Sequence, residues 1–137
     1  MEIPEYLTVH DEYVHFAPVG RVTRAEAVAM ISGVIAFCRR QKYRFLLADI
    51  TRLTGFKPPL IGTRFWIVRE WAERSGGDVD IAMVALAEYI DPDKFGVIVM
   101  SNADVRADIF TLEEEARAWL LTGDPDDGAG ERSELPP

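Results

Sequence analysis

A carboxylate and two hydroxyl groups stand close together after the apolar stretch YRFLLADI. Asp49 lies near the end of this stretch, and Thr51 and Thr54 follow in the segment TRLTGFKPPLIG. An ionised carboxylate at the end of an apolar strand needs hydrogen-bond donors, and the backbone from Thr51 to Gly55 can supply them. Asp49 therefore either holds its own loop together or faces a ligand or partner. Thr51 and Thr54 are either turn hydroxyls or phosphorylation sites.

The densest group of large apolar side chains follows this loop: Phe56, Leu60, Phe65, Trp66 and Trp71. These side chains cannot all face one core, because a helix buries only one stripe. Helical spacing predicts an inward stripe of Ile61, Phe65, Val68 and Ala72, whereas Trp66 is either half buried or exposed. Exposed apolar patches usually mark a protein or ligand contact. We therefore expect a binding site made of Asp49, Thr51, Thr54, Gly55, Phe56 and Trp66.

Catalysis is not predicted, because no nucleophile stands with a recognisable base and no phosphate-binding loop is present. His10 and His15 could approach one another across a hairpin, but two histidines without further converging ligands are weak evidence for zinc. We accordingly expect no enzyme, no cofactor and no resident metal.

The net charge and the composition of the chain indicate which kinds of partner to expect. The chain has 137 residues, a formal net charge of −8 and 48% hydrophobic residues. Nucleic acid is not an expected partner, because its binding relies on Lys and Arg to neutralise phosphates. The start MEIPEYL lacks the basic and apolar regions of a secretory signal, which predicts a cytoplasmic protein. No apolar stretch is long enough to predict a membrane span, and the single Cys38 falls on an apolar helical stripe where it would fill the core.

The first half of the chain predicts a hairpin, a helix and a strand. Residues 6–10 and 13–17 alternate in character around a polar turn, as in a β-hairpin. Thr23 and Glu26 have the spacing of a capping box, which predicts a helix that runs to about Gln41. The apolar run 43–50 is typical of an interior strand that is covered on both faces.

The second half alternates helices and strands. We expect Pro58 and Pro59 to open a helix that ends at Ser75, Gly76 and Gly77, followed by a strand over 79–86. Asp91 and Pro92 are interpreted as the start of a helix to Asn102 despite the β character of GVIVM. A last strand over 105–110 precedes a helix with a second capping box, Thr111 and Glu114, and with Ala116, Trp119 and Leu120 in the core. Residues 123–137 are acidic and poor in bulky apolar groups, which predicts a disordered tail.

This order of elements predicts an α/β fold in which helices pack on a mixed sheet of four or five strands that opens with a β-hairpin. The segments LLADITRLTGF, FGVIVMSNADVRADIF and FTLEEEARAWLL together resemble the STAS and SpoIIAA-like superfamily of small bacterial domains. The resemblance covers roughly residues 5–121, and we expect residues 1–122 to form a single SpoIIAA-like domain.

The resemblance implies a non-catalytic role in binding a protein partner, within bacterial signalling or regulation. Anti-sigma-factor antagonists of this superfamily carry a phosphorylatable Ser or Thr, preceded by an acidic residue, at the start of the helix after the loop. Asp49, Thr51, Thr54 and Gly55 are similar in kind, but no acidic residue directly precedes Thr54. The alternative is a carrier or sensor that takes a small lipophilic molecule between the sheet and the helix of residues 59–71. An exposed apolar surface around Trp66 would also favour a homodimer.

Overall fold

The sheet opens with an antiparallel hairpin at one edge. The computed structural model describes residues 3–122, so the expected tail at 123–137 lies outside the described residues. Strand β1 (Leu7–Val9) pairs with β2 (Val14–Phe16), and Leu7 lies opposite Phe16. The hairpin is therefore confirmed, with shorter strands than the alternation predicted.

Three further strands extend the sheet in parallel with β2. They are β4 (Phe45–Asp49), β6 (Asp80–Val84) and β7 (Ala107–Phe110), and the order across the sheet is β1-β2-β4-β6-β7. Strands β4 and β6 are the central pair, and most of their side chains are buried. Five strands with one antiparallel edge make the mixed sheet that the sequence predicts.

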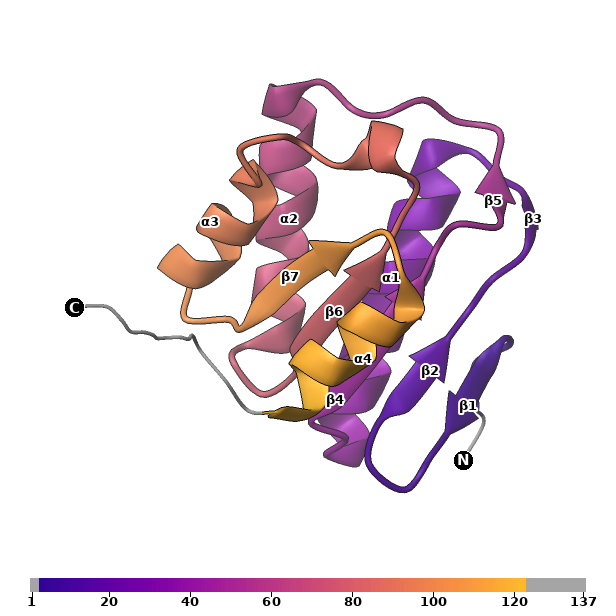
Figure 1. The fold of residues 1–137 in the computed structure, drawn as a ribbon, viewed down its shortest axis with the longest axis vertical. Helices are drawn as coiled ribbons and strands as arrows, with labels where there is room; N and C mark the ends of the chain where they lie inside the picture. The colour runs from indigo at the N-terminus through magenta and orange to yellow at the C-terminus, as the bar shows by residue number, and fades with distance from the viewer. Residues whose placement is uncertain (1–2, 123–137) are drawn as a thin grey trace.

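Helices cover both faces of the sheet. Figure 1 shows α4 (Glu113–Thr122) crossing in front of the strands, whereas α1 (Arg24–Gln41) and α2 (Ile61–Ser75) lie behind them. The shorter α3 (Phe95–Asn102) packs beside α2 and near β7. No helix in residues 3–122 is long and apolar enough to cross a membrane.

The two faces of the sheet have separate cores. The larger core joins α1, α2 and α3 to the sheet, and the fully buried Ile35 and Leu46 are among its members. Cys38 lies in it, and burial raises the pKa of its thiol to about 12, as befits a core side chain. The smaller core joins α4 to the sheet through Ala116 and Leu120. Trp119, predicted to be buried, is only half buried because it lies beside Phe110 at the border of this core.

The predicted starts of the helices are partly right. The capping box at the start of α1 is present, since Thr23 and Glu26 each accept a backbone hydrogen bond from the other. Helix α2 begins at Ile61 rather than at the two prolines, because a residue before proline is driven toward extended backbone.

Helices α3 and α4 also begin later than predicted. Helix α3 begins at Phe95 and not at Pro92, because residues 91–94 form a turn in which Lys94 N donates to Asp91 O. Asp91 still serves that helix, because its Oδ2 accepts from Phe95 N at 2.8 Å. Helix α4 begins at Glu113, one residue later than a capping box at Thr111 would place it.

Candidate functional site

The loop after β4 is built around Asp49. Asp49 is only 8% exposed, and its Oδ1 accepts hydrogen bonds from Thr51 N at 2.9 Å and from Thr51 Oγ1 at 2.7 Å. These two bonds fold the chain back immediately after the strand, as in an Asx turn. The geometry thus supports the interpretation that Asp49 holds its own loop together, and it commits the hydroxyl of Thr51 to the same task.

Two other titratable side chains join Asp49 from distant parts of the chain. The Glu113 side chain at the start of α4 hydrogen-bonds Asp49, and Glu113 Oε2 lies 2.9 Å from His15 Nε2 on β2. The cluster connects the hairpin, the central strand β4 and the last helix.

The balance of these contacts favours an ionised Asp49. Burial by itself would raise the pKa of this carboxyl group. The hydrogen bonds from Glu113 and from Thr51, together with the nearby positive charge of Arg52, outweigh burial and hold the pKa of Asp49 below its ordinary value. Asp49 is therefore a stable negative anchor for the loop at neutral pH.

A small second sheet fixes the rest of the loop. Strand β5 (Leu53–Thr54) pairs in parallel with β3 (Gly20–Arg21), which precedes α1. Gly55 follows with φ +102°, and a Cβ at this position would lie 2.5 Å from Val22 O. Only glycine fits there without displacement of the backbone. Thr54 is exposed at the surface of this second sheet, and its Oγ1 donates to Gly20 O at 3.5 Å.

Phe56 joins the loop to the segment after β6. Its ring stacks on that of Tyr89 with centroids 5.5 Å apart, and its carbonyl oxygen accepts from Tyr89 Oη at 2.7 Å. Tyr89 belongs to the 3-10 helix η1 (Ala87–Tyr89), and its own carbonyl oxygen accepts from Arg64 Nη1 at 3.1 Å. Phe56, Tyr89 and Arg64 thereby connect three segments that leave the carboxyl ends of β4 and β6.

Trp66 lies on the outside of α2. Its side chain is 66% exposed, and the preceding Leu60 and Ile61 are 82% and 59% exposed. We call these three residues the Trp66 surface. The ring of Phe65 meets that of Trp66 edge-on at 5.2 Å. The predicted inward stripe is therefore wrong at Ile61, because the first turn of α2 extends beyond the ends of the strands (Figure 1) and has no sheet to pack against.

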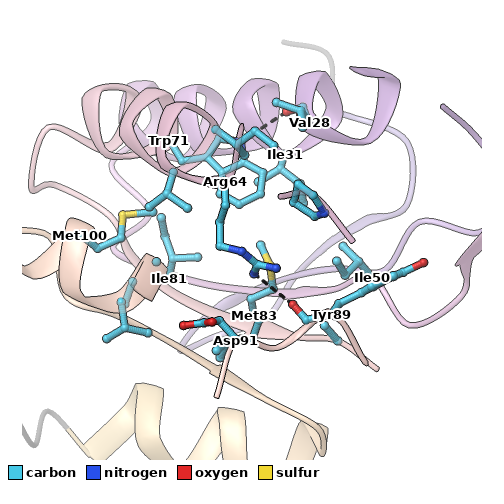
Figure 2. Close-up of a pocket in the computed structure, with 18 of the residues that line it drawn as sticks. Val28, Ile31, Ile50, Arg64, Trp71, Ile81, Met83, Tyr89, Asp91 and Met100 are labelled. Carbon is cyan, nitrogen blue, oxygen red and sulfur yellow. Dashed lines mark hydrogen bonds between the residues drawn. The ribbon is translucent and has the colours of Figure 1, made fainter. Parts of the chain in front are cut away.

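Behind the loop, a pocket of about 150 Å³ lies between the sheet and helices α1, α2 and α3 (Figure 2). Its walls are almost wholly apolar and come from three helices and two strands. They include Val28 and Ile31 of α1, Val68 and Trp71 of α2, Val97 and Met100 of α3, and Ile81 and Met83 of β6. Figure 2 shows Arg64 reaching from α2 into this space toward Tyr89. Phe56 lines the pocket, but Phe65 and Trp66 do not.

The structure does not bring together all six predicted site residues. Asp49, Thr51, Thr54 and Gly55 share one hydrogen-bonded loop, Phe56 joins this loop to the pocket, and Trp66 faces outward on α2. His10 and His15 do approach, with ring centroids 6.2 Å apart, but His15 is engaged by Glu113. Within residues 3–122 no three His, Cys, Asp or Glu side chains are arranged to hold a metal ion.

Three residues of this region were not predicted from the sequence. Glu113 lies 64 positions after Asp49, so no local pattern could pair them. Tyr89 lies in a short turn without a periodic signal. Arg64, by contrast, carried a usable signal, because it precedes Val68 by four residues and Trp71 by seven and so shares their helix face. A charged residue on a buried face indicates a special environment.

Two solved structures are similar in fold to this chain. The fold is similar to that of an anti-sigma factor antagonist from Mycobacterium paratuberculosis, at 16% identity and a TM-score of 0.51, over 83% of this chain and 90% of that one. An uncharacterized protein of the DUF3478 family with a SpoIIAA-like fold, from Shewanella loihica, has 16% identity and a TM-score of 0.49, over 84% and 90%. No protein-family model and no curated protein matches the sequence.

At this level of identity the likeness concerns the fold alone, because one fold can host many functions. The expected α/β fold, with a mixed five-stranded sheet that opens with a hairpin, is confirmed, and the anti-sigma factor antagonist shares this fold. The comparison therefore establishes the fold of this chain. Its role is inferred below from the loop after β4, the Trp66 surface and the pocket.

Proposed function

We propose that this chain is a non-catalytic protein-binding domain that acts in the cytoplasm, in bacterial signalling or regulation. The observation that carries the proposal is the exposure of Trp66, at 66%, on the same helix whose start exposes Leu60, at 82%. Large aromatic side chains are enriched at the centres of protein interfaces, where their burial supplies much of the binding energy. A tryptophan in water on a well-packed helix is therefore best explained by a partner that covers it.

The loop that precedes α2 in the chain also supports this assignment. Asp49, Thr51 and Gly55 give it a fixed conformation through two side-chain hydrogen bonds and one glycine-dependent turn. A rigid loop loses little conformational entropy on binding, which favours affinity. The proposed interface consists of the Trp66 surface together with the exposed part of this loop at Thr54. A protein partner is also in keeping with the fold shared with an anti-sigma factor antagonist, whose name denotes action on another protein.

A phosphorylation switch is not part of the proposal. The resemblance drawn from the sequence would place the phosphorylated residue at the start of the helix after the loop. Thr54 instead lies in β5, and α2 begins seven residues later at Ile61. The Thr51 hydroxyl already donates to Asp49, and a phosphate there would be repelled by that carboxylate.

Affinity capture from the native cells tests the proposed interface. The wild-type chain is compared with Trp66→Ala and with Leu112→Ala, a control that truncates another apolar side chain of comparable exposure, 54%, ahead of α4. We expect a protein that is retained by the wild type and by the control and is lost with Trp66→Ala. The same captured proteins with all three baits would refute the assignment of the surface.

A second candidate function is the binding of a small apolar molecule, and the pocket behind the loop favours it. Its volume of about 150 Å³ is below the roughly 300–1,000 Å³ typical of drug-sized ligands. It is comparable to a cavity of about 150 Å³ in another protein that takes benzene. A ligand in this pocket would therefore have a body about the size of one aromatic ring.

A further inference from the structure

Arg64 is a half-buried cation of the apolar pocket, and it has no carboxylate partner among residues 3–122. Arg64 extends from α2 into the pocket (Figure 2), where its Nη1 donates to Tyr89 O at 3.1 Å. Among residues 3–122, no carboxylate lies within ion-pair distance of this guanidinium. A guanidinium group has five N–H donors in a planar fork, and a single carbonyl oxygen uses only one of them. The remaining donors are those that commonly bind a carboxylate through two parallel hydrogen bonds.

The other charged groups that line the pocket are paired with each other, bound at a helix start, or exposed at the edge of the pocket. Lys94 Nζ lies 2.7 Å from Asp108 Oδ1, so this pair neutralises itself. Asp91 Oδ2 accepts from the first backbone N–H of α3 at 2.8 Å, a position where the helix dipole favours a negative charge. Arg24 is exposed at the edge of the pocket and donates to Lys57 O at 3.5 Å. Three cations and two carboxylates line the pocket, so its net charge is positive although the chain as a whole carries −8.

We propose that the pocket binds a small organic anion, with a ring-sized apolar body among the helices and a carboxylate paired with Arg64. This inference rests on the second candidate function, the apolar pocket, and adds the charge and the size of the ligand. Burial of the ring removes apolar surface from water, and the half-buried Arg64 recognises the carboxylate through charge-assisted hydrogen bonds, which are stronger than neutral ones.

Three small molecules of nearly equal shape test whether the pocket prefers a negatively charged ligand. Phenylacetate, phenylacetamide and phenethylamine are titrated into the ¹⁵N-labelled chain at constant ionic strength. We expect phenylacetate to bind about tenfold or more tightly than phenylacetamide, and the amine to bind most weakly. The backbone amide signals that move should include those of Ala85, Tyr89 and Gly96, which surround the pocket.

Variants then separate the role of Arg64 from the effect of removing any positive charge from the protein. Arg64→Gln should abolish the preference for phenylacetate over phenylacetamide. Arg69→Gln is the matched control, because Arg69 lies on the same helix, is exposed, pairs with Glu73 at 3.8 Å and does not line the pocket. Ala85→Leu fills the pocket and should prevent binding of both compounds. Thermal melting checks that each variant folds, and if Ala85→Leu does not fold, the map of shifted amides locates the site.

The outcomes separate two claims: that the pocket binds a ligand, and that Arg64 recognises the carboxylate of this ligand. Equal binding of phenylacetate and phenylacetamide, tighter binding of the amine, or a preference that survives in Arg64→Gln would overturn this inference and leave the apolar pocket as a ligand site. No binding of any probe to the folded wild type would overturn both the inference and the second candidate function.

Discussion

At the scale of single residues, Asp49 is the side chain on which the loop depends most. It accepts two hydrogen bonds from Thr51, and the carboxyl group is buried. We expect Asp49→Ala to lower the free energy of unfolding by about 1–3 kcal/mol, because it leaves the half-buried donors of Thr51 without their acceptor. Urea denaturation at pH 7 measures this loss. Asp93→Ala removes an exposed carboxylate and serves as the control, and an equal effect of both substitutions would contradict the role of Asp49.

The same residue predicts how stability depends on pH. The pKa of Asp49 is lower in the folded protein than in the unfolded chain. Its contribution to stability is therefore fully present above the unfolded value of about 4 and is lost as the pH falls through the folded value. Asp49→Asn removes this titration and keeps an acceptor for Thr51. The stability difference between wild type and Asp49→Asn should thus shrink as the pH is lowered from 5 to 2. A difference that is constant over this range would mean that the pKa of Asp49 is not lowered.

Thr54 is expected to remain unphosphorylated in the native cells. It lies in β5 rather than at a helix start, and no acidic residue precedes it directly. Thr54→Asp should accordingly change partner capture only modestly. Intact-mass analysis of the chain purified from its own cells checks the modification state. One stoichiometric phosphate on Thr51 or Thr54 would contradict the account and would make the loop a switch.

At the scale of elements, α4 is held to the sheet by Leu120 more than by Trp119. Leu120 is fully buried, whereas Trp119 is half buried beneath the guanidinium of Arg106, which lies 4.0 Å from the centroid of its indole ring. Leu120→Ala should lower the free energy of unfolding by about 2–5 kcal/mol, the usual range for a buried leucine. Trp119→Ala should lower it by less, although the residue is larger. Thermal melting of both variants compares them, and a larger loss for Trp119→Ala would show that the helix docks differently.

An element could be predicted from the sequence where the residues that determine it lie close together in the chain. The capping box of Thr23 and Glu26 lies within one turn, so the start of α1 was predictable. The starts of α2 and α3 were not, because Leu60 and Lys94 precede them without a side-chain cap. Ile61 keeps the helical spacing of the core stripe and is nevertheless exposed, since spacing does not reveal where the sheet ends.

The candidate site was predictable only in part for the same reason. The turn of Asp49 and Thr51 spans two residues, and its hydrogen bonds were foreseen as one of two possibilities. The contact of Asp49 with Glu113 and the contact of Arg64 with Tyr89 join separate elements. These depend on the order of strands in the sheet, which no local pattern contains.

At the scale of the whole molecule, the Trp66 surface should also govern self-association. An exposed apolar surface without its partner tends to pair with a second copy, and twofold dimers are the commonest soluble assembly. We expect light scattering at micromolar concentration to show a dimer for the wild type and a monomer for Trp66→Glu. Ile98→Glu, which changes another half-exposed residue on α3, is the control and should remain dimeric. A wild-type monomer would contradict self-association and leave the surface to another protein alone.

The most direct test of the central claim is to ask what touches position 66 inside the cell. A photo-crosslinking phenylalanine analogue replaces Trp66 in one variant and Leu112 in another, and irradiated native cells are analysed for covalent adducts of the chain. Both positions are more than half exposed in the structure, so both analogues are free to react. We expect a discrete protein adduct at position 66 and none at position 112. No adduct at position 66, or the same adducts at both positions, would contradict the claim that this surface binds a protein partner.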